Sequence, residues 1–91
     1  MTSYVYIIES EMDGTLYKGF TSDYMRRLEE HNQGKSRYTS RKAPWKLLYV
    51  EQFESKTAAL IKEKQLKRCN RKYIEWLCKQ PFNLIRNNIA G

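Results

Sequence analysis

The chain has 91 residues, and its 17 Lys and Arg against 10 Asp and Glu give a formal net charge of +7. This length allows one small core and excludes a second domain, so we expect residues 1–91 to form a single domain. No apolar stretch reaches the roughly 20 residues needed to cross a bilayer, and no signal-peptide pattern opens the chain. A membrane protein is therefore excluded, and a soluble, cytoplasmic protein is expected.

The positive charge is concentrated in two segments. Residues 35–46 carry five basic residues and no acid, and residues 56–72 carry seven basic residues and one acid, whereas residues 1–34 have a net charge of −3. Lysine-rich helix faces can simply be solvated. Two basic clusters in so short a chain nevertheless favour a polyanionic partner, because each neutralised phosphate releases counterions, and they indicate nucleic acid.

The two cysteines, Cys69 and Cys78, are predicted to be reduced thiols. A zinc site needs about four Cys or His ligands at close spacing. The chain has a single histidine, far from both cysteines in the sequence. The sequence therefore predicts no zinc site.

The chain begins with a β-hairpin pattern. Residues 4–9 and 15–20 are rich in β-branched and aromatic residues and are separated by a polar turn. Because side chains alternate between the two faces of a strand, Tyr6 and Tyr17 are expected side by side on one surface of the sheet.

A helix is predicted next, from a cap at Ser22 or Asp23 to about Gln33, where a glycine follows. Residues four apart lie on the same face of a helix, so Arg27 and His31 present a guanidinium and an imidazole together.

Residues 35–44 have turn composition and no periodicity, which predicts an exposed basic loop. The candidate nucleic-acid-binding residues of this region are Lys35, Arg37, Tyr38, Arg41, Lys42 and Lys46. Tyr38 is the best candidate for stacking on a base, whereas Trp45 and Trp76 are expected to pack in the core or at its edge.

The second half of the chain predicts one strand and three helical segments. The strand covers about 46–53, a helix follows a cap at Ser55, and another helix runs from Asn70 until Pro81 ends it. Residues 82–91 are predicted to form a last short helical piece. The order ββαβαα predicts an α+β domain with a three-stranded antiparallel sheet.

Glu63 is a lone acid in the basic segment of the second long helix. Helical spacing aligns it with Ala59 and Leu66, so its carboxylate faces the body of the protein. A half-buried carboxylate needs a partner, which can be a divalent cation or a basic side chain. Lys67, four residues later, is the simplest basic partner.

Five side chains together could hydrolyse a phosphodiester. They are Tyr6, Tyr17, Arg27, His31 and Glu63. A carboxylate can hold a divalent ion, a guanidinium can bind a phosphate at two points, and a phenol can exchange a proton with water. Each also has a simpler explanation. Tyrosines pack in cores, and an arginine pairs with a nearby acid such as Glu30 or Asp23. A histidine near a helix C-terminus interacts favourably with the helix macrodipole.

The chain resembles a known family, the GIY-YIG nuclease domain. The matching segments are Tyr4-Val-Tyr6, Tyr17-Lys-Gly19 with Thr21, Arg27, His31-Asn32 and Ala59-Leu-Ile-Lys-Glu63. The resemblance covers a motif-bearing core at about 4–70, with a helical extension at about 71–91, and is closest to small stand-alone bacterial members related to the N-terminal domain of an excinuclease. Tyr4, Val5 and Lys18 depart from the name motif, and Asn70 and Asn83 compete for an asparagine that larger relatives place after the glutamate.

The resemblance implies a role for each of these residues. Tyr6 would activate water with Tyr17 beside it, Arg27 would stabilise the phosphate, and His31 would support proton transfer or phosphate contact. Glu63 would be the single protein carboxylate on one Mg²⁺ or Mn²⁺. The leading hypothesis is a DNA endonuclease of repair or recombination, with DNA favoured over RNA. The competing hypothesis is a non-catalytic nucleic-acid-binding module that retains the nuclease scaffold.

Overall fold

Three antiparallel strands form the centre of the structure, a computed structural model that describes residues 2–85. The strands are β1 (Ser3–Ser10), β2 (Leu16–Thr21) and β3 (Trp45–Phe53), and their order in the sheet is β2-β1-β3. Both pairings of β1 are antiparallel. The α+β class and the three-stranded antiparallel sheet are confirmed.

Three α-helices flank the sheet, as the sequence predicts. They are α1 (Tyr24–Asn32), α2 (Lys56–Lys67) and α3 (Arg71–Cys78), and a short 3₁₀ helix, η1 (Ser40–Lys42), precedes β3. The side chains of Asp23, Ser55 and Asn70 each accept a hydrogen bond from a backbone N–H three residues later. These caps satisfy N–H groups that have no partner within the helix, so they fix where each helix begins.

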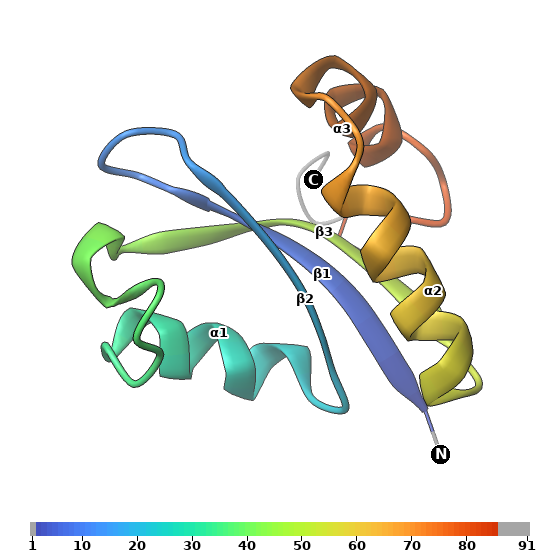
Figure 1. Cartoon of the computed structure of the whole chain (residues 1–91), viewed down its shortest axis with the longest axis horizontal. Helices are drawn as coiled ribbons and strands as arrows, with labels where there is room; N and C mark the ends of the chain where they lie inside the picture. The colour runs from blue at the N-terminus through green and yellow to red at the C-terminus, as the bar shows by residue number, and fades with distance from the viewer. Residues whose placement is uncertain (1, 86–91) are drawn as a thin grey trace.

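The helices cover both faces of the sheet, with α1 on one side and α2 and α3 on the other (Figure 1). Alternate residues of β1 are therefore buried in two different clusters. The cluster under α2 and α3 contains Val5, Ile7, Leu66, Ile74 and Leu77. The cluster on the α1 side contains Tyr6, Ile8, Trp45 and Val50. The central strand is consequently apolar on both faces. Strand β2 forms one edge of the sheet.

The basic segment at residues 35–44 is more ordered than an exposed loop. Thr39 and Ser36 are buried, and η1 follows directly. Trp45 Nε1 donates to the Thr39 carbonyl over 2.9 Å. The Asn32 side chain, at the end of α1, accepts from the Trp45 backbone N–H and donates to its carbonyl. The predicted exposed basic loop is confirmed for most of these side chains, but Ser36 and Thr39 are buried, because tertiary hydrogen bonds that composition cannot indicate hold its second half.

The segment after α3 lies along the free edge of β3. The Asn83 amide accepts from Val50 N at 3.0 Å and donates to the carbonyls of Leu48 and Cys78, and Leu84 N donates to the Val50 carbonyl. Residues 82–85 form turns and not the predicted helix. The remainder of that predicted helical piece, residues 86–91, lies outside the described residues.

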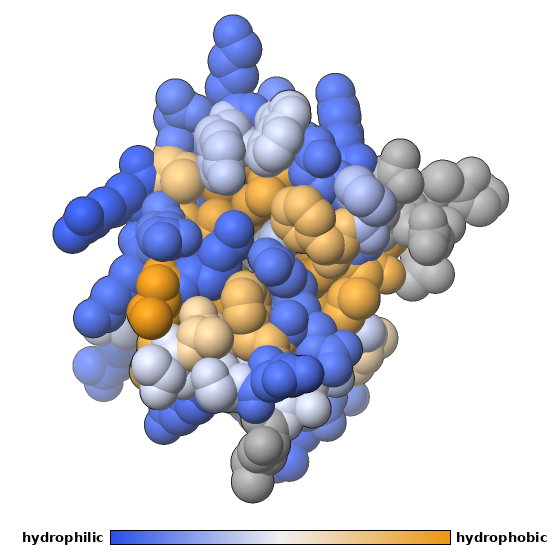
Figure 2. Space-filling view, turned by 90° about the vertical axis from the view of Figure 1, so that its right-hand side faces the viewer, coloured by the Kyte–Doolittle hydropathy of each residue, from blue (hydrophilic) through white to orange (hydrophobic). Residues whose placement is uncertain are grey.

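Two other expectations about side chains have mixed outcomes. Trp45 is buried as predicted, but Trp76 is 52% exposed and lies against the Tyr73 ring on the outer face of α3. Figure 2 shows the side of the molecule that carries α2 and α3, with apolar side chains gathered in the middle of a hydrophilic surface. Cys69 and Cys78 are free thiols, as expected. Among residues 2–85, no helix is both long and apolar enough to cross a membrane.

Candidate active site

The first component of the candidate site is a phenol that lies across the neighbouring strand. Tyr6 in β1 is paired with Gly19 in β2. A Cβ atom added at Gly19 would lie only 2.6 Å from the Tyr6 hydroxyl oxygen, closer than non-bonded atoms approach. Gly19 therefore makes room for the phenol near the edge of the sheet. The sequence drew attention to this glycine only as part of a motif, without its steric role.

His31 and Tyr17 complete a cluster of three rings. Tyr6 Oη lies 2.9 Å from His31 Nε2, and the imidazole is fully buried. The Tyr17 ring centroid is 5.0 Å from that of His31 and 6.3 Å from that of Tyr6. Strand alternation thus correctly predicts that Tyr6 and Tyr17 lie side by side, and His31 joins them from α1.

The other imidazole nitrogen has a partner that the sequence did not indicate. His31 Nδ1 lies 2.7 Å from Oγ1 of Thr39, which is only 1% exposed. Thr39 is eight residues away in the segment predicted to be an exposed loop. The available signal was that a buried histidine requires partners for both ring nitrogens.

The environment keeps both members of the Tyr6–His31 pair neutral. Burial, with a smaller contribution from the positive charge of Arg27, lowers the pKa of His31 to about 4. Burial, followed by the neighbouring Tyr17, raises the pKa of Tyr6 to about 12, although Arg27 beside the phenol opposes this increase. At neutral pH the hydrogen bond therefore joins a protonated phenol to an uncharged imidazole.

Arg27 lies between the phenol and a small polar hollow. Its Nη1 is 2.9 Å from Glu30 Oε1, so Arg27 also forms the ion pair that the sequence suggested as its simpler role. The hollow has a volume of about 160 Å³. Its lining residues are Thr21, Ser22, Asp23, Arg26, Arg27 and Glu30. A guanidinium that borders both the phenol and an open, polar space can bind a phosphate there.

Glu63 comes from α2, on the opposite face of the sheet from α1. Its side chain is 13% exposed, and its Oε1 lies 3.5 Å from Lys67 Nζ, the basic partner that the sequence allowed. Its negative charge makes a small contribution to the raised pKa of Tyr6, after those of burial and Tyr17. The sheet edge formed by β2 is where side chains from both faces can approach each other.

A lone carboxylate suits one particular kind of metal site. Residues 2–85 contain no group of three or more His, Cys, Asp or Glu side chains arranged to hold an ion. Mg²⁺ commonly keeps several waters and binds through one or two carboxylates plus substrate phosphates. Glu63 fits an ion shared with a phosphate and does not fit a closed protein cage. Asn70 and Asn83 are engaged in the α3 cap and at the β3 edge.

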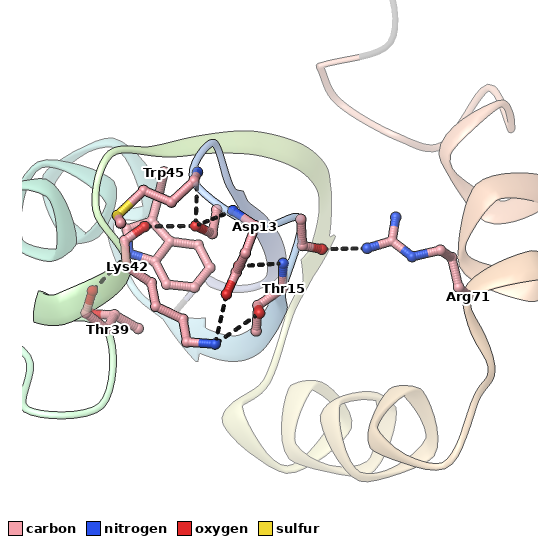
Figure 3. A network of polar contacts seen from close by, with 9 residues as sticks. Asp13, Thr15, Thr39, Lys42, Trp45 and Arg71 are labelled. Carbon is pink, nitrogen blue, oxygen red and sulfur yellow. Dashed lines mark hydrogen bonds and ion pairs between the residues drawn. The ribbon is translucent and has the colours of Figure 1, made fainter.

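The six candidate nucleic-acid-binding residues divide into two groups. Lys42 Nζ is 2.9 Å from Asp13 Oδ2 and 3.0 Å from Thr15 Oγ1, so it fastens this segment to the β1–β2 turn (Figure 3). Lys46 pairs with Glu9 at 3.4 Å. The others are Lys35, Arg37, Tyr38 and Arg41. Their three cations have no acid within ion-pair distance in the described part of the chain, and the Tyr38 side chain is largely exposed.

Comparisons with known proteins identify the family of this chain and support its fold. A family model described as the GIY-YIG catalytic domain matches residues 2–77. A UPF0213 protein of Streptococcus agalactiae is 47% identical over 70 residues, which are 76% of this chain and 78% of that protein. One from Haloquadratum walsbyi is 38% identical over 82 residues, 89% of this chain and 91% of the relative. The solution NMR structure of a UPF0213 protein from Bacillus halodurans is similar with a TM-score of 0.59 at 35% identity, covering 97% of this chain and 94% of that one. The chain therefore belongs to the GIY-YIG catalytic domain family.

Proposed function

We propose that this protein is an endonuclease that hydrolyses DNA phosphodiester bonds with the help of one divalent ion. The observation that carries the proposal is the position of the Tyr6 phenol. It is hydrogen-bonded to the buried neutral imidazole of His31 and lies beside the Arg27 guanidinium. A purely structural tyrosine does not require this combination. Membership of a catalytic domain family associated with nucleases supports the same conclusion.

The residues of the chain divide the reaction between them. Arg27 would bind the scissile phosphate and stabilise the charge that develops on it. Ionised Tyr6 would accept a proton from the attacking water while the water oxygen forms its bond to phosphorus. Solvent would protonate the departing oxygen of the cut strand. Because the pKa of Tyr6 is about 12, its ionised form depends on the donors around its oxygen. Tyr17 and His31 keep bulk water from the inner side of the phenol.

Glu63 is the residue that would hold Mg²⁺ or Mn²⁺. A bound divalent ion would supply positive charge next to the phosphate and lower the pKa of a coordinated water. Lys67, which is 3.5 Å from the Glu63 carboxylate, would act as its counter-ion in the free protein. The Glu63 side chain is half-buried on α2, and its negative charge makes a small contribution to the raised pKa of Tyr6.

The substrate proposed is DNA with a branch, flap or damaged site, in repair or recombination. The exposed cations Lys35, Arg37 and Arg41 lie in the segment that also supplies Thr39 to the cluster of rings. They can bind the backbone on one side of the scissile phosphate without reading sequence. Selection of RNA would require contacts to the 2′-hydroxyl, so RNA duplexes and hybrids belong in the same test.

The test is cleavage of labelled forked, nicked, flapped and four-way DNA in Mg²⁺ or Mn²⁺. Arg27→Ala and Glu63→Gln should each reduce the single-turnover rate by about 100-fold or more. Arg68→Ala and Glu75→Gln are the matched controls. Arg68 is an exposed arginine directly after α2, and Glu75 is an exposed acid on α3. Full activity in Arg27→Ala and Glu63→Gln would contradict this mechanism.

The second candidate function is a non-catalytic nucleic-acid-binding module, and the Lys67–Glu63 contact favours it. If this ion pair is permanent, Glu63 serves only to hold α2, and the basic surface binds DNA without a metal. Binding would then be salt-dependent, independent of Mn²⁺ and followed by no cleavage of any substrate. Metal-dependent cleavage that is lost in Glu63→Gln would rule out this alternative.

A further inference from the structure

The outer face of α3 carries an exposed aromatic pair that the candidate active site does not use. Trp76 is 52% exposed and Tyr73 is 42% exposed, and their ring centroids lie 5.5 Å apart with the ring planes inclined by 32°. The inner side of the same helix is already occupied, because Ile74 and Leu77 are buried in the core. Tryptophan is highly buried on average, and both ring types are enriched at contact surfaces. The pair therefore indicates a surface that contacts another molecule.

Two cations flank Trp76 along the helix. Lys72 is four residues before Trp76 and Lys79, at the C-cap, is three residues after it, so helical spacing places the three side chains on one face. Both lysines are exposed, and neither has an acid within ion-pair distance in the described part of the chain. Residues 64–80 carry six basic residues and one acid, Glu75. The aromatic pair is thus surrounded by positive charge.

This combination fits a single strand of nucleic acid better than another protein. Proteins that bind single strands stack the bases on aromatic rings and hold the backbone with basic side chains. Interfaces between proteins are depleted in lysine, and two copies of this face would bring like charges together. The apolar side chains on this side of the molecule are also surrounded by hydrophilic ones (Figure 2). A polyanion with exposed bases is complementary to both the rings and the charge.

We infer that the α3 surface formed by Lys72, Tyr73, Trp76 and Lys79 binds a single-stranded segment of DNA, with a base stacked on Trp76 and the adjoining phosphates bound by the two lysines. Lys72 and Lys79 are about 10 Å apart along the helix axis, and their flexible stems can reach phosphates on both sides of one stacked nucleotide. One consequence rests on the proposed function, namely that this surface holds the unpaired arm of a flapped or forked substrate. Binding of the strand can be measured without cleavage.

Helix α3 offers a fixed platform for such a strand. Arg71, at its start, lies 3.0 Å from Glu9 Oε2 of β1 through Nη1 and donates through Nη2 to the Gly14 carbonyl in the β1–β2 turn. At the other end, the Asn83 amide donates to the Cys78 carbonyl over 2.9 Å and also bonds to the backbone of β3. Both ends of the helix are therefore tied to the sheet. Little ordering of the protein has to occur when a base stacks on the pair, which favours affinity.

The direct experiment is fluorescence anisotropy of a labelled oligo(dT) strand in EDTA, where no divalent ion supports cleavage. Trp76→Ala should weaken binding about fivefold or more, the typical effect of removing one stacking ring, whereas Trp76→Phe should retain most of the affinity. Ile61→Ala is the matched control, because it removes an exposed apolar side chain from α2 without removing a ring. A blunt duplex should bind Trp76→Ala as well as the wild type, since its bases stack on each other. Unchanged oligo(dT) binding by Trp76→Ala, or equal losses for strand and duplex, would overturn the inference.

A second measurement needs only the wild-type protein. Trp45 is 4% exposed, so quenching of tryptophan fluorescence by oligo(dT) reports on Trp76. Absence of quenching at saturating oligo(dT) would contradict stacking, even if Trp76→Ala does not fold. Lys72→Ala and Lys79→Ala should keep the quenching and should each reduce the salt dependence of binding by about one phosphate contact. An unchanged salt dependence in both variants would contradict the phosphate contacts.

The α3 surface and the proposed nuclease can fail independently. Trp76-dependent binding of oligo(dT), with no cleavage of any substrate, would support the surface and contradict the nuclease. Metal-dependent cleavage of branched DNA, with oligo(dT) binding that does not depend on Trp76, would contradict the surface and leave the nuclease in place. Self-association that is lost in Trp76→Ala, measured by sedimentation velocity and accompanied by unchanged oligo(dT) binding, would overturn the inference and assign this face to a second copy of the chain.

Discussion

Individual residues of the candidate site were predictable where a short-range rule places them. Strand alternation places Tyr6 and Tyr17 on one face of the sheet, and helical spacing places Arg27 and His31 on one face of α1. Thr39 was missed because its contact with His31 depends on how an irregular segment folds back onto α1. The pairing of Lys42 with Asp13 was missed for the same reason, since the two are separated by 29 residues.

Replacing Gly19 tests the close approach of the phenol. Gly19→Ala should destabilise the fold by about 1–3 kcal/mol, a typical cost of overpacking, because its Cβ would overlap the Tyr6 hydroxyl oxygen. Urea denaturation of a double-mutant cycle provides the measurement. The substitution should cost less in a Tyr6→Phe background, which lacks that oxygen. Equal costs in both backgrounds would show that the two residues do not conflict.

The titration of His31 links the site to stability. Its pKa of about 4 is below the usual 6.5, so the unfolded chain takes up a proton first as the pH falls. The stabilising contribution is complete above about pH 6.5 and decreases toward pH 4, with a loss of about 2 kcal/mol between pH 7 and pH 5. Urea denaturation at those two pH values checks this, and NMR titration of the single histidine gives its pKa directly. A pKa near 6.5 would contradict the burial that the structure describes.

At the scale of elements, helix caps and strand composition located the regular structure to within a few residues. Asp23, Ser55 and Asn70 begin the helices as predicted, because a cap acts on its own backbone. The burial of Ser36 and Thr39 within the exposed segment 35–44 was not predicted, and residues 82–85 form turns where a helix was expected. Their conformations depend on buried hydrogen bonds of Thr39 and Asn83 to distant parts of the chain, which local sequence does not encode.

The two asparagines that competed for a place in the site should instead differ in their effects on stability. Asn83→Ala leaves backbone groups of β3 unpaired and should cost about 2–4 kcal/mol. Asn70→Ala removes only an exposed helix cap and should cost about 1 kcal/mol. Chemical denaturation measures both. Neither variant should alter the cleavage rate while it is folded, and a specific loss of cleavage in either would place that asparagine in the site.

At the scale of the whole molecule, the charge distribution predicted a nucleic-acid surface but not which cations are available. Ion pairs occupy Lys42 and Lys46, whereas Lys35, Arg37 and Arg41 have no acidic partner among the described residues. Replacing any of these three by Ala should reduce the salt dependence of DNA binding by about one phosphate contact. Fluorescence anisotropy across a salt series measures this slope. An unchanged slope in all three variants would show that DNA binds to another face of the protein.

The arrangement of layers explains why the five proposed side chains come from both halves of the chain. Helices α1 and α2 cover opposite faces of the sheet, and their side chains can meet only where the sheet ends (Figure 1). Tyr6 reaches this edge because β2 carries a glycine opposite it. The central claim is that this phenol takes the proton during DNA hydrolysis.

The most direct test is the single-turnover rate of branched-DNA cleavage by Tyr6→Phe in Mn²⁺. Tyr4→Phe is the matched control, because Tyr4 lies on the same strand face and packs against Tyr24 away from His31. The phenol hypothesis predicts that Tyr6→Phe loses about 100-fold or more in rate while Tyr4→Phe remains close to the wild type. Cleavage by Tyr6→Phe at the wild-type rate, or no cleavage by the wild type on any branched substrate, would contradict it.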